Sequence, residues 1–258
     1  RNYETFWAIP SGAPSLLASF LPGFDVINAQ GEVQQPGVAV AKPGRDRIVK
    51  APVILNGSGS YFAKTFNWQI ISGPPDHDAS LENSSSAVAN LVLNVGDDKD
   101  ESDSDGEYII QLSVGNSKTN IEDEDQKQSQ TIGITLDSTL AKHGSELNFS
   151  DDIRPILQTT LFNQRTCQSC HFDESNVEGI PVYYDNSNSQ LYWDVRGRVD
   201  FRDPDNSILI RKPTRLQHGG GVRIDLNDDF GKKIYSTLME WILHGAPCGA
   251  EVSVCAEQ

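Results

Sequence analysis

The sequence predicts a two-part fold, with an all-β module in the N-terminal half and an all-α domain after it. From about residue 37 to 136, short apolar segments alternate with polar positions and end at turn residues, as the strands of a β-sandwich do. After residue 143, apolar residues recur at helical spacing around a Cys-x-x-Cys-His pentad. The expected boundaries are an N-terminal extension over 1–36, the β-sandwich over 37–140 and the α domain over 141–258.

Four segments of the β module are expected to be strands. "APVILNGSGS" (51–60) is an apolar strand that ends in turn residues, and "TFNWQIISGPP" (65–75) places Phe66, Trp68 and Ile70 on one face. "EYIIQLSVGN" (107–116) and "QTIGITL" (130–136) complete the series. Trp68 could form a platform for a ligand, but on an alternating strand we expect it to be the core aromatic.

Two acidic runs interrupt the β module, at 97–107 and 122–125. Calcium could bind to the carboxylates of the first run, which are Asp98, Asp100, Asp103 and Asp105. The run lacks EF-hand spacing and a bidentate glutamate at position 12 of the loop. A solvated loop is therefore the favoured interpretation.

Two helices are expected to flank the pentad. In "FSDDIRPILQTTLF", either Ser150 or Asp152 could cap a helix, and Pro155 favours Asp152 because proline then lies in the first turn. The apolar positions of this helix are Ile153, Ile156, Leu157 and Leu161. A closing helix carries Ile234, Tyr235, Leu238, Trp241 and Ile242 at helical intervals and stops at Gly245 and Pro247.

The composition limits the classes of function that the protein can have. With 37% apolar and 22% charged residues, the chain is typical of a soluble globular protein, and no apolar run approaches the ~18 residues of a transmembrane helix. Its first residues lack the features of a signal peptide and look like a mature or trimmed start. A net charge of −15 argues against nucleic-acid binding. It indicates a solvated acidic surface, or one that steers a basic partner.

The pentad fits three chemistries. Cys167 and Cys170 are spaced to form thioethers with the two vinyl groups of a haem, which leaves His171 to bind the iron. A redox dithiol would need a βαβ context, which the flanks do not have. A zinc site would need a second ligand pair, but Cys248 and Cys255 are separated by six residues, wider than a zinc knuckle. One covalent haem c is therefore the predicted cofactor.

Cys248 and Cys255 are then the remaining cysteine pair. A disulfide between them would close a short loop and requires an oxidising compartment. Both cysteine pairs thus predict an exported protein, in the periplasm, at the cell surface or outside the cell.

Two resemblances follow from the quoted motifs. Residues of roughly 37–137 resemble the PKD family of immunoglobulin-like modules, through "PGRDRIVKAPVILNGSGS", the tryptophan strand ending in "SGPP" and "GEYIIQLSV". This resemblance implies no catalysis. Residues of about 148–247 resemble the monohaem cytochrome c domains of multidomain secreted bacterial proteins. The resemblance lies in five motifs and their order, "DDIRPILQ", "CQSCH", "DPDNSILIRKP", "HGGG" and "LMEWILHGAP". This second resemblance implies an all-α cytochrome c fold around one haem.

The distal side of the iron is either left open or filled by a ligand from elsewhere in the chain. His218, in the loop "RLQHGGGVR", is the favoured candidate. Related cytochromes take this ligand, often a methionine, from the corresponding loop, and glycines let the backbone approach a porphyrin. Met239 is the alternative, and an open site is the third possibility. His77 and His143 are expected to be surface residues, and His244 should lie at a helix C-terminus, where a cation suits the dipole.

The rest of the haem pocket is expected from the middle of the α domain. Tyrosines and a tryptophan could wall it, namely Tyr183, Tyr184, Tyr192 and Trp193. Arginines could pair with the haem propionates, namely Arg196, Arg198 and Arg211. The predicted function is single-electron transfer with an unknown redox partner, with the sandwich as spacer or docking module. The alternatives are a haem enzyme or gas sensor with an open distal site, and a carbohydrate- or protein-binding module with an accessory haem domain.

Overall fold

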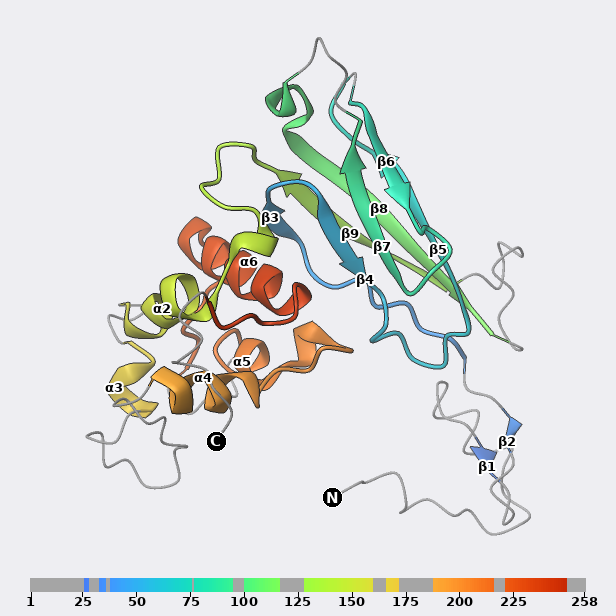
Figure 1. Cartoon of the computed structure of the whole chain (residues 1–258). Coiled ribbons are helices and arrows are strands. Elements are labelled where there is room, and N and C mark those ends of the chain that lie inside the picture. The colour runs from blue at the N-terminus through green and yellow to red at the C-terminus, as the bar shows by residue number, and fades with distance from the viewer. Residues whose placement is uncertain are drawn as a thin grey trace.

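The computed structural model describes residues 26–27, 33–35, 38–75, 77–94, 100–116, 128–159, 166–171, 188–215 and 221–249. Strands fill the first half of this part of the chain and helices the second (Figure 1). The prediction of a β-rich half followed by helices is confirmed at that level. None of the described helices combines the length and the hydrophobicity needed to cross a membrane.

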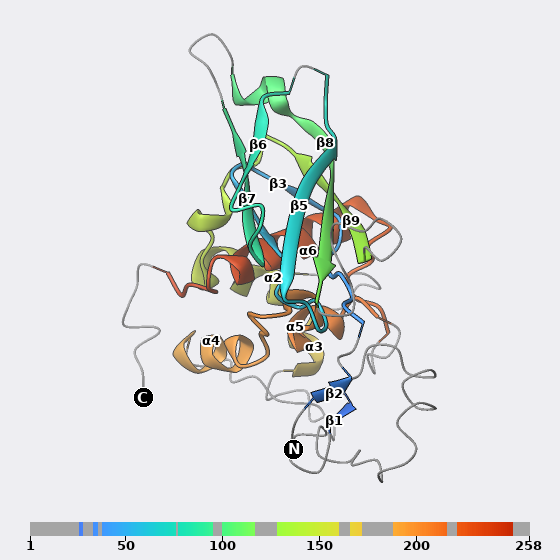
Figure 2. The ribbon, with the colours of Figure 1, turned by 90° about the vertical axis from the view of Figure 1, so that its right-hand side faces the viewer.

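Two sheets form the β half, and they lie as two layers when the molecule is viewed from the side (Figure 2). The first sheet has the order β3 (Arg47–Val49), β9 (Gln128–Leu136), β8 (Gly106–Gly115) and β5 (Thr65–Ser72). The second has the order β4 (Val53–Asn56), β7 (Val88–Leu93) and β6 (Ala79–Glu82). All neighbours pair antiparallel except β3 and β9, which are parallel. A separate two-stranded ladder joins β1 (Val26–Ile27) and β2 (Val33–Gln35).

The core of the sandwich collects the inward residues of both sheets. Trp68 is 2% exposed, and its indole Nε1 donates a hydrogen bond to the Ser86 carbonyl at 3.1 Å. Phe66 and Ile70 pack against the same cluster, as the alternating pattern of this strand predicts. The structure therefore confirms that Trp68 is a core aromatic and not a surface platform.

Short helical elements form the second half. They are a 3-10 turn (Gly144–Glu146), a π-helical turn (Phe149–Ile153), α2 (Arg154–Gln158), α3 (Gln168–His171), α4 (Asn188–Arg196), a second 3-10 turn (Pro204–Asn206), α5 (Ile208–Arg211) and α6 (Asp229–Leu243). Their apolar residues share one core, which includes Phe149, Leu191, Tyr192, Val195, Leu238 and Trp241.

The cap predicted for the first helix is wrong. The helical segment begins at Phe149 with a π-turn, and the side chain of Asn148 caps it by accepting a hydrogen bond from the Asp151 amide at 2.9 Å. Asp152 already lies inside that turn, and its carboxylate binds Lys142 Nζ at 2.7 Å. Pro155 does lie in the first turn of α2, as expected.

The closing helix α6 has the predicted apolar face and the predicted stop. Asp228 caps its N-terminus by accepting from the Gly231 amide at 3.0 Å, and Gly245 follows its end with φ 87°. The buried residues of α6 also include polar ones, Ser236 and Glu240. These two face the sandwich, because Ser236 Oγ accepts a hydrogen bond from the Ile48 amide at 3.0 Å. Helix α6 thus covers the edge strand β3 and links the two halves.

Candidate functional site

The pentad forms a single helical turn. The amides of Cys170 and His171 donate to the Cys167 carbonyl at 3.2 and 3.0 Å, so α3 places the side chains at positions 167, 170 and 171 on one side. Neither Cys167 nor Cys170 is in a disulfide, and all three residues are partly exposed. Two thiols and an imidazole on one turn are the protein groups that a c-type haem requires.

The thiol of Cys167 has an apolar environment. Cys167 packs against the helical core. Burial raises the pKa of its thiol to about 11, although the nearby charge of Arg223 lowers that pKa. A catalytic dithiol normally has a depressed thiol pKa, because the thiolate is the reactive form. Cys167 therefore lacks the electrostatic environment of a redox dithiol.

Helix α4 carries two buried donors that find no acceptor among the described residues. They are Trp193 Nε1 and Arg196 Nε. The guanidinium carbon of Arg196 lies 5.6 Å from the centroid of the Trp193 ring and 5.1 Å from that of Phe201. Buried donors almost always have a partner in folded proteins, so this pair is suited to hold a group with acceptor atoms.

The other residues expected to line a haem pocket have different positions. Tyr192 is a core residue, and its hydroxyl donates to the Ala246 carbonyl at 3.0 Å. Arg198 Nη1 donates to the Asp194 carbonyl, and Arg211 is an exposed residue at the end of α5. Tyr183 and Tyr184 lie outside the described residues.

Of the two candidate distal ligands, the described residues include only Met239. His218 lies outside the described residues. Met239 is 2% exposed and lines a cleft between the two halves of the molecule, together with Lys42, Arg47 and Leu243. The choice between His218, Met239 and an open site stays a prediction.

Two histidines that we expected at the surface are half-buried. His143 Nε2 lies 2.6 Å from the Pro52 carbonyl oxygen, and its Nδ1 accepts from the Ser145 amide at 3.2 Å. His77 packs edge-on against Tyr108 at 5.2 Å between ring centroids. Both rings are thus partly covered surface residues, each in contact with a residue that is distant in sequence.

His244 follows the end of α6, where the sequence predicts it. Its Nδ1 lies 2.9 Å from the Glu240 carbonyl oxygen, and its ring contacts that of His143 at 5.2 Å between centroids.

Cys248 is disulfide-bonded. Since Cys167 and Cys170 are not in a disulfide, this agrees with the predicted pair within the described residues. Its expected partner, Cys255, lies outside them.

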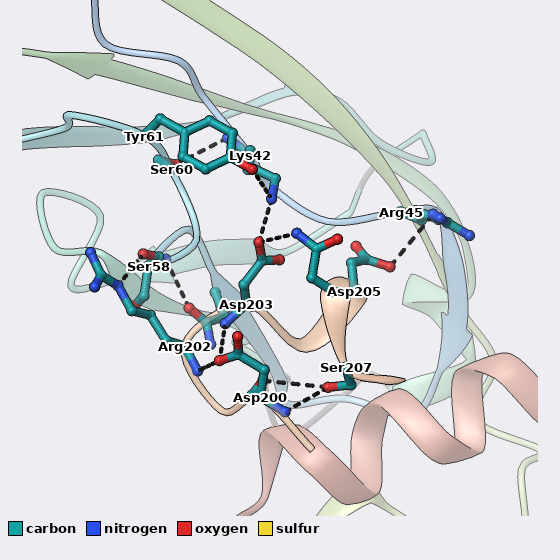
Figure 3. Close-up of polar contacts among 12 residues, drawn as sticks. Lys42, Arg45, Ser58, Ser60, Tyr61, Asp200, Arg202, Asp203, Asp205 and Ser207 are labelled. Carbon is teal, nitrogen blue, oxygen red and sulfur yellow. Dashed lines mark hydrogen bonds and ion pairs between the residues drawn. The ribbon is translucent and has the colours of Figure 1, made fainter. Parts of the chain in front are cut away.

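A second polar cluster joins the helical half to the sandwich, and Figure 3 shows most of it. Lys42 forms an ion pair with Asp203. Burial lowers the pKa of Lys42, but the hydrogen bond that its ammonium donates to the Asp203 carboxylate and the charge of that carboxylate raise the pKa above its usual value. Asp205 lies 3.6 Å from Arg45 Nε and accepts a hydrogen bond from the Tyr235 hydroxyl at 2.7 Å. The segment "DPDNS" thus attaches the helical half to the sandwich.

The most deeply buried ion pair of the junction joins β3 to α6. Arg47 Nε donates to Glu240 Oε1 at 2.9 Å, and the two side chains are 2% and 6% exposed. Arg47 also donates to the Ile54 carbonyl. Glu240 Oε2 is buried without a hydrogen-bond partner in the described part of the structure. A cleft of about 190 Å³ opens beside this pair, and two ion pairs in its lining join Lys42 to Asp203 and Arg45 to Asp205.

The acidic loop forms local contacts. Asp103 and Asp100 form a reciprocal cap on a 3-10 turn (Glu101–Ser104), and Asp105 accepts hydrogen bonds from the amide and the hydroxyl of Ser138. Asp98 and the run 122–125 lie outside the described residues. Within the described ranges, no cluster of three or more His, Cys, Asp or Glu side chains is arranged to hold an ion.

Comparisons with known proteins add little. No family model matches the chain, and no curated protein matches it. A solved PKD domain, from KIAA 1837 protein, is 23% identical over 43% of this chain and 99% of its own length, with a TM-score of 0.26. A nucleoside hydrolase-related protein from Saccharophagus degradans, described as associated with carbohydrate metabolism, is 18% identical over 39% of this chain and 25% of its own, also with a TM-score of 0.26. Neither likeness is close enough to support an argument.

Sequence reasoning missed the junction. Arg47 and Glu240 look like ordinary surface charges, and at a sequence separation of 193 no local signal shows that they pair. The orphaned donor of Trp193 was missed as well, because a tryptophan in an aromatic-rich segment is usually explained by packing.

Proposed function

We propose that this protein transfers single electrons through one haem c, bound covalently by Cys167 and Cys170 with His171 as the proximal ligand. The observation that carries the proposal is the single turn of α3, which holds two cysteine side chains outside any disulfide and the imidazole on one side. On this proposal the helical half is a monohaem cytochrome c domain. The haem supplies a one-electron couple at its iron, and the protein positions it and sets its potential.

Two features favour haem attachment over the other uses of the pentad. The raised pKa of Cys167 disfavours a redox dithiol, since that chemistry depends on an accessible thiolate. The unpartnered donors of Trp193 and Arg196 match the acceptor groups that a haem carries on its edge. Haem attachment takes place outside the cytoplasm, so the proposal includes export to the periplasm, the cell surface or the medium.

The role that we assign to the sandwich is mechanical. It would be a PKD-like module that acts as a rigid support, because its strand β3 is bound to α6 by a buried ion pair and a backbone hydrogen bond. A support of this kind keeps the haem domain at a fixed orientation within the protein. A redox partner with a basic surface would be attracted by the net charge of −15.

His218 is our proposed distal ligand, and the spectrum of the holoprotein tests this choice. Ligation by His218 and His171 predicts a low-spin haem that does not bind CO rapidly in the ferrous state, with a lower potential than Met239 ligation would give. The His218→Ala variant should become high-spin and bind CO, whereas Met239→Leu should keep the parent spectrum. Rapid CO binding by the unmodified holoprotein would instead indicate an open site and a haem enzyme or gas sensor.

A further inference from the structure

We propose that Arg45 and Arg215, in the cleft between the sandwich and the helical half, bind a small oxyanion, either a phosphate group or a carboxylate. This inference does not depend on the haem and adds a second binding site to the protein. It starts from two arginine side chains that line the same cleft and use few of their hydrogen-bond donors.

Folding brings the two arginines together from different halves of the molecule. Arg45 directly follows Gly44, whose φ of 93° forms the turn before β3 and favours glycine. Arg215 lies after α5, and the residue before it, Thr214, accepts a hydrogen bond from Arg45 Nη1 at 3.5 Å. This contact spans a sequence separation of 169, so the two cations become neighbours only in the folded protein.

Most of the guanidinium donors remain available. A guanidinium has five N–H donors, and the 3.5 Å bond to Thr214 is at the long limit for one of them. The Nε atom of Arg45 lies 3.6 Å from Asp205 Oδ1, which is an ion pair but is too long for a hydrogen bond. The side chain of Arg215 forms no ion pair or hydrogen bond with the described residues, and only its backbone amide donates, to the Lys212 carbonyl.

The cleft also has a surplus of positive charge. Four cationic side chains line it and two carboxylates, and Glu240 neutralises one of the cations from behind. One positive charge therefore remains in a chain whose net charge is −15. A local surplus of this sign attracts anions. The cations are Lys42, Arg45, Arg47 and Arg215, and the carboxylates are those of Asp203 and Asp205.

The geometry favours an oxyanion over a halide. The planar fork of a guanidinium matches two oxygens of a carboxylate or a phosphate, and an anion between two guanidiniums also reduces their mutual repulsion. Figure 3 shows Arg45 on one side of Asp205, with Lys42 and Asp203 on the other, so an anion bound at Arg45 is kept away from the Asp203 carboxylate.

The size of the cleft limits the ligand. Its volume of about 190 Å³ is below the roughly 300–1,000 Å³ of pockets that enclose drug-sized molecules. It suits a free ion or the anionic end group of a larger molecule.

The test uses isothermal titration calorimetry of the full-length protein with sodium phosphate, sodium acetate and sodium chloride, at constant pH and ionic strength. The variants are Arg45→Gln and Arg215→Gln. Lys212→Gln is the matched control, because it removes the same charge from an exposed residue near Arg215 that does not line the cleft. Circular dichroism checks that each variant is folded.

We expect phosphate or acetate to bind the parent protein saturably, and the tighter of the two identifies the group that the site recognises. Chloride should give no saturable heat. Each arginine variant should weaken the binding at least about tenfold, because it loses charge-assisted hydrogen bonds to the anion. Lys212→Gln should change the affinity less than about twofold, since an exposed charge outside the cleft is screened by salt.

Three results would overturn the assignment. They are the absence of saturable binding of both oxyanions to the parent protein, equal binding of chloride, and arginine variants that bind as tightly as Lys212→Gln. If Arg45→Gln does not fold, Arg215→Gln decides alone, because Arg215 is exposed and its side chain supports no other contact among the described residues.

Discussion

Loss of the Arg47 side chain should destabilise the whole molecule strongly. In Arg47→Met, the carboxylate of Glu240 remains buried, at 6% exposure of its side chain, and loses the guanidinium at 2.9 Å. An uncompensated buried charge of this kind costs about 3–5 kcal/mol. Coulomb's law at an effective dielectric constant of 20 gives about 4 kcal/mol for unit charges 4 Å apart, which is the same range.

The matched control removes both charges. In Arg47→Met combined with Glu240→Leu, no buried charge remains, so the free energy of unfolding should return to within about 1 kcal/mol of the parent value. Urea denaturation of the full-length protein, followed by tryptophan fluorescence and by circular dichroism, measures all three proteins. A loss below about 1 kcal/mol in the single variant, or a double variant as unstable as the single one, would refute the reasoning.

Three further outcomes are expected. In the haem-free protein, iodoacetamide should alkylate Cys170 faster than Cys167 at pH 8, because burial raises the pKa of the Cys167 thiol to about 11; equal rates would contradict this. Tyr235→Phe should cost about 1.5–3 kcal/mol through the lost hydrogen bond to the Asp205 carboxylate. Burial raises the pKa of Tyr235 well above 10, so stability should fall as the pH rises from about 10, where the unfolded tyrosine ionises, up to the folded pKa. The phenylalanine variant should show a shallower fall in urea titrations at pH 9 to 11, and an unchanged slope would exclude Tyr235 as a source. Trp68→Ala should cost about 3–5 kcal/mol, and a loss under 1 kcal/mol would contradict its place in the core.

The parts of the fold that could be predicted are those with a local pattern. Strand β5 alternates from Phe66 through Trp68 to Ile70, so the two-residue period alone predicts which face of the strand carries Trp68. Helix α6 has apolar residues at helical intervals, and these identify the face that includes Trp241. Strand β7, "VANLVL", also alternates and could have been found, whereas β6 has only four residues and little apolar signal.

The parts that could not be predicted depend on contacts between distant segments. Glu240 lies on the side of α6 where a charged residue is normally solvated, and only the presence of β3 makes it a buried residue. The cap at Asn148 was missed because a π-turn begins the helical segment earlier than an α-helical pattern would.

For the candidate site, spacing alone identified Cys167, Cys170 and His171. No sequence pattern shows that Trp193 Nε1 and Arg196 Nε lack hydrogen-bond acceptors, because this depends on how the folded chain packs around α4.

The most direct test of the account is the covalent state of the pentad. The full-length chain should be produced with the cytochrome c maturation machinery, alongside a Cys167→Ala/Cys170→Ala control, and its intact mass and pyridine haemochrome spectrum measured. We predict the mass of the polypeptide plus one haem and a c-type haemochrome, both lost in the control. A mass equal to that of the bare polypeptide under the same conditions would contradict the account.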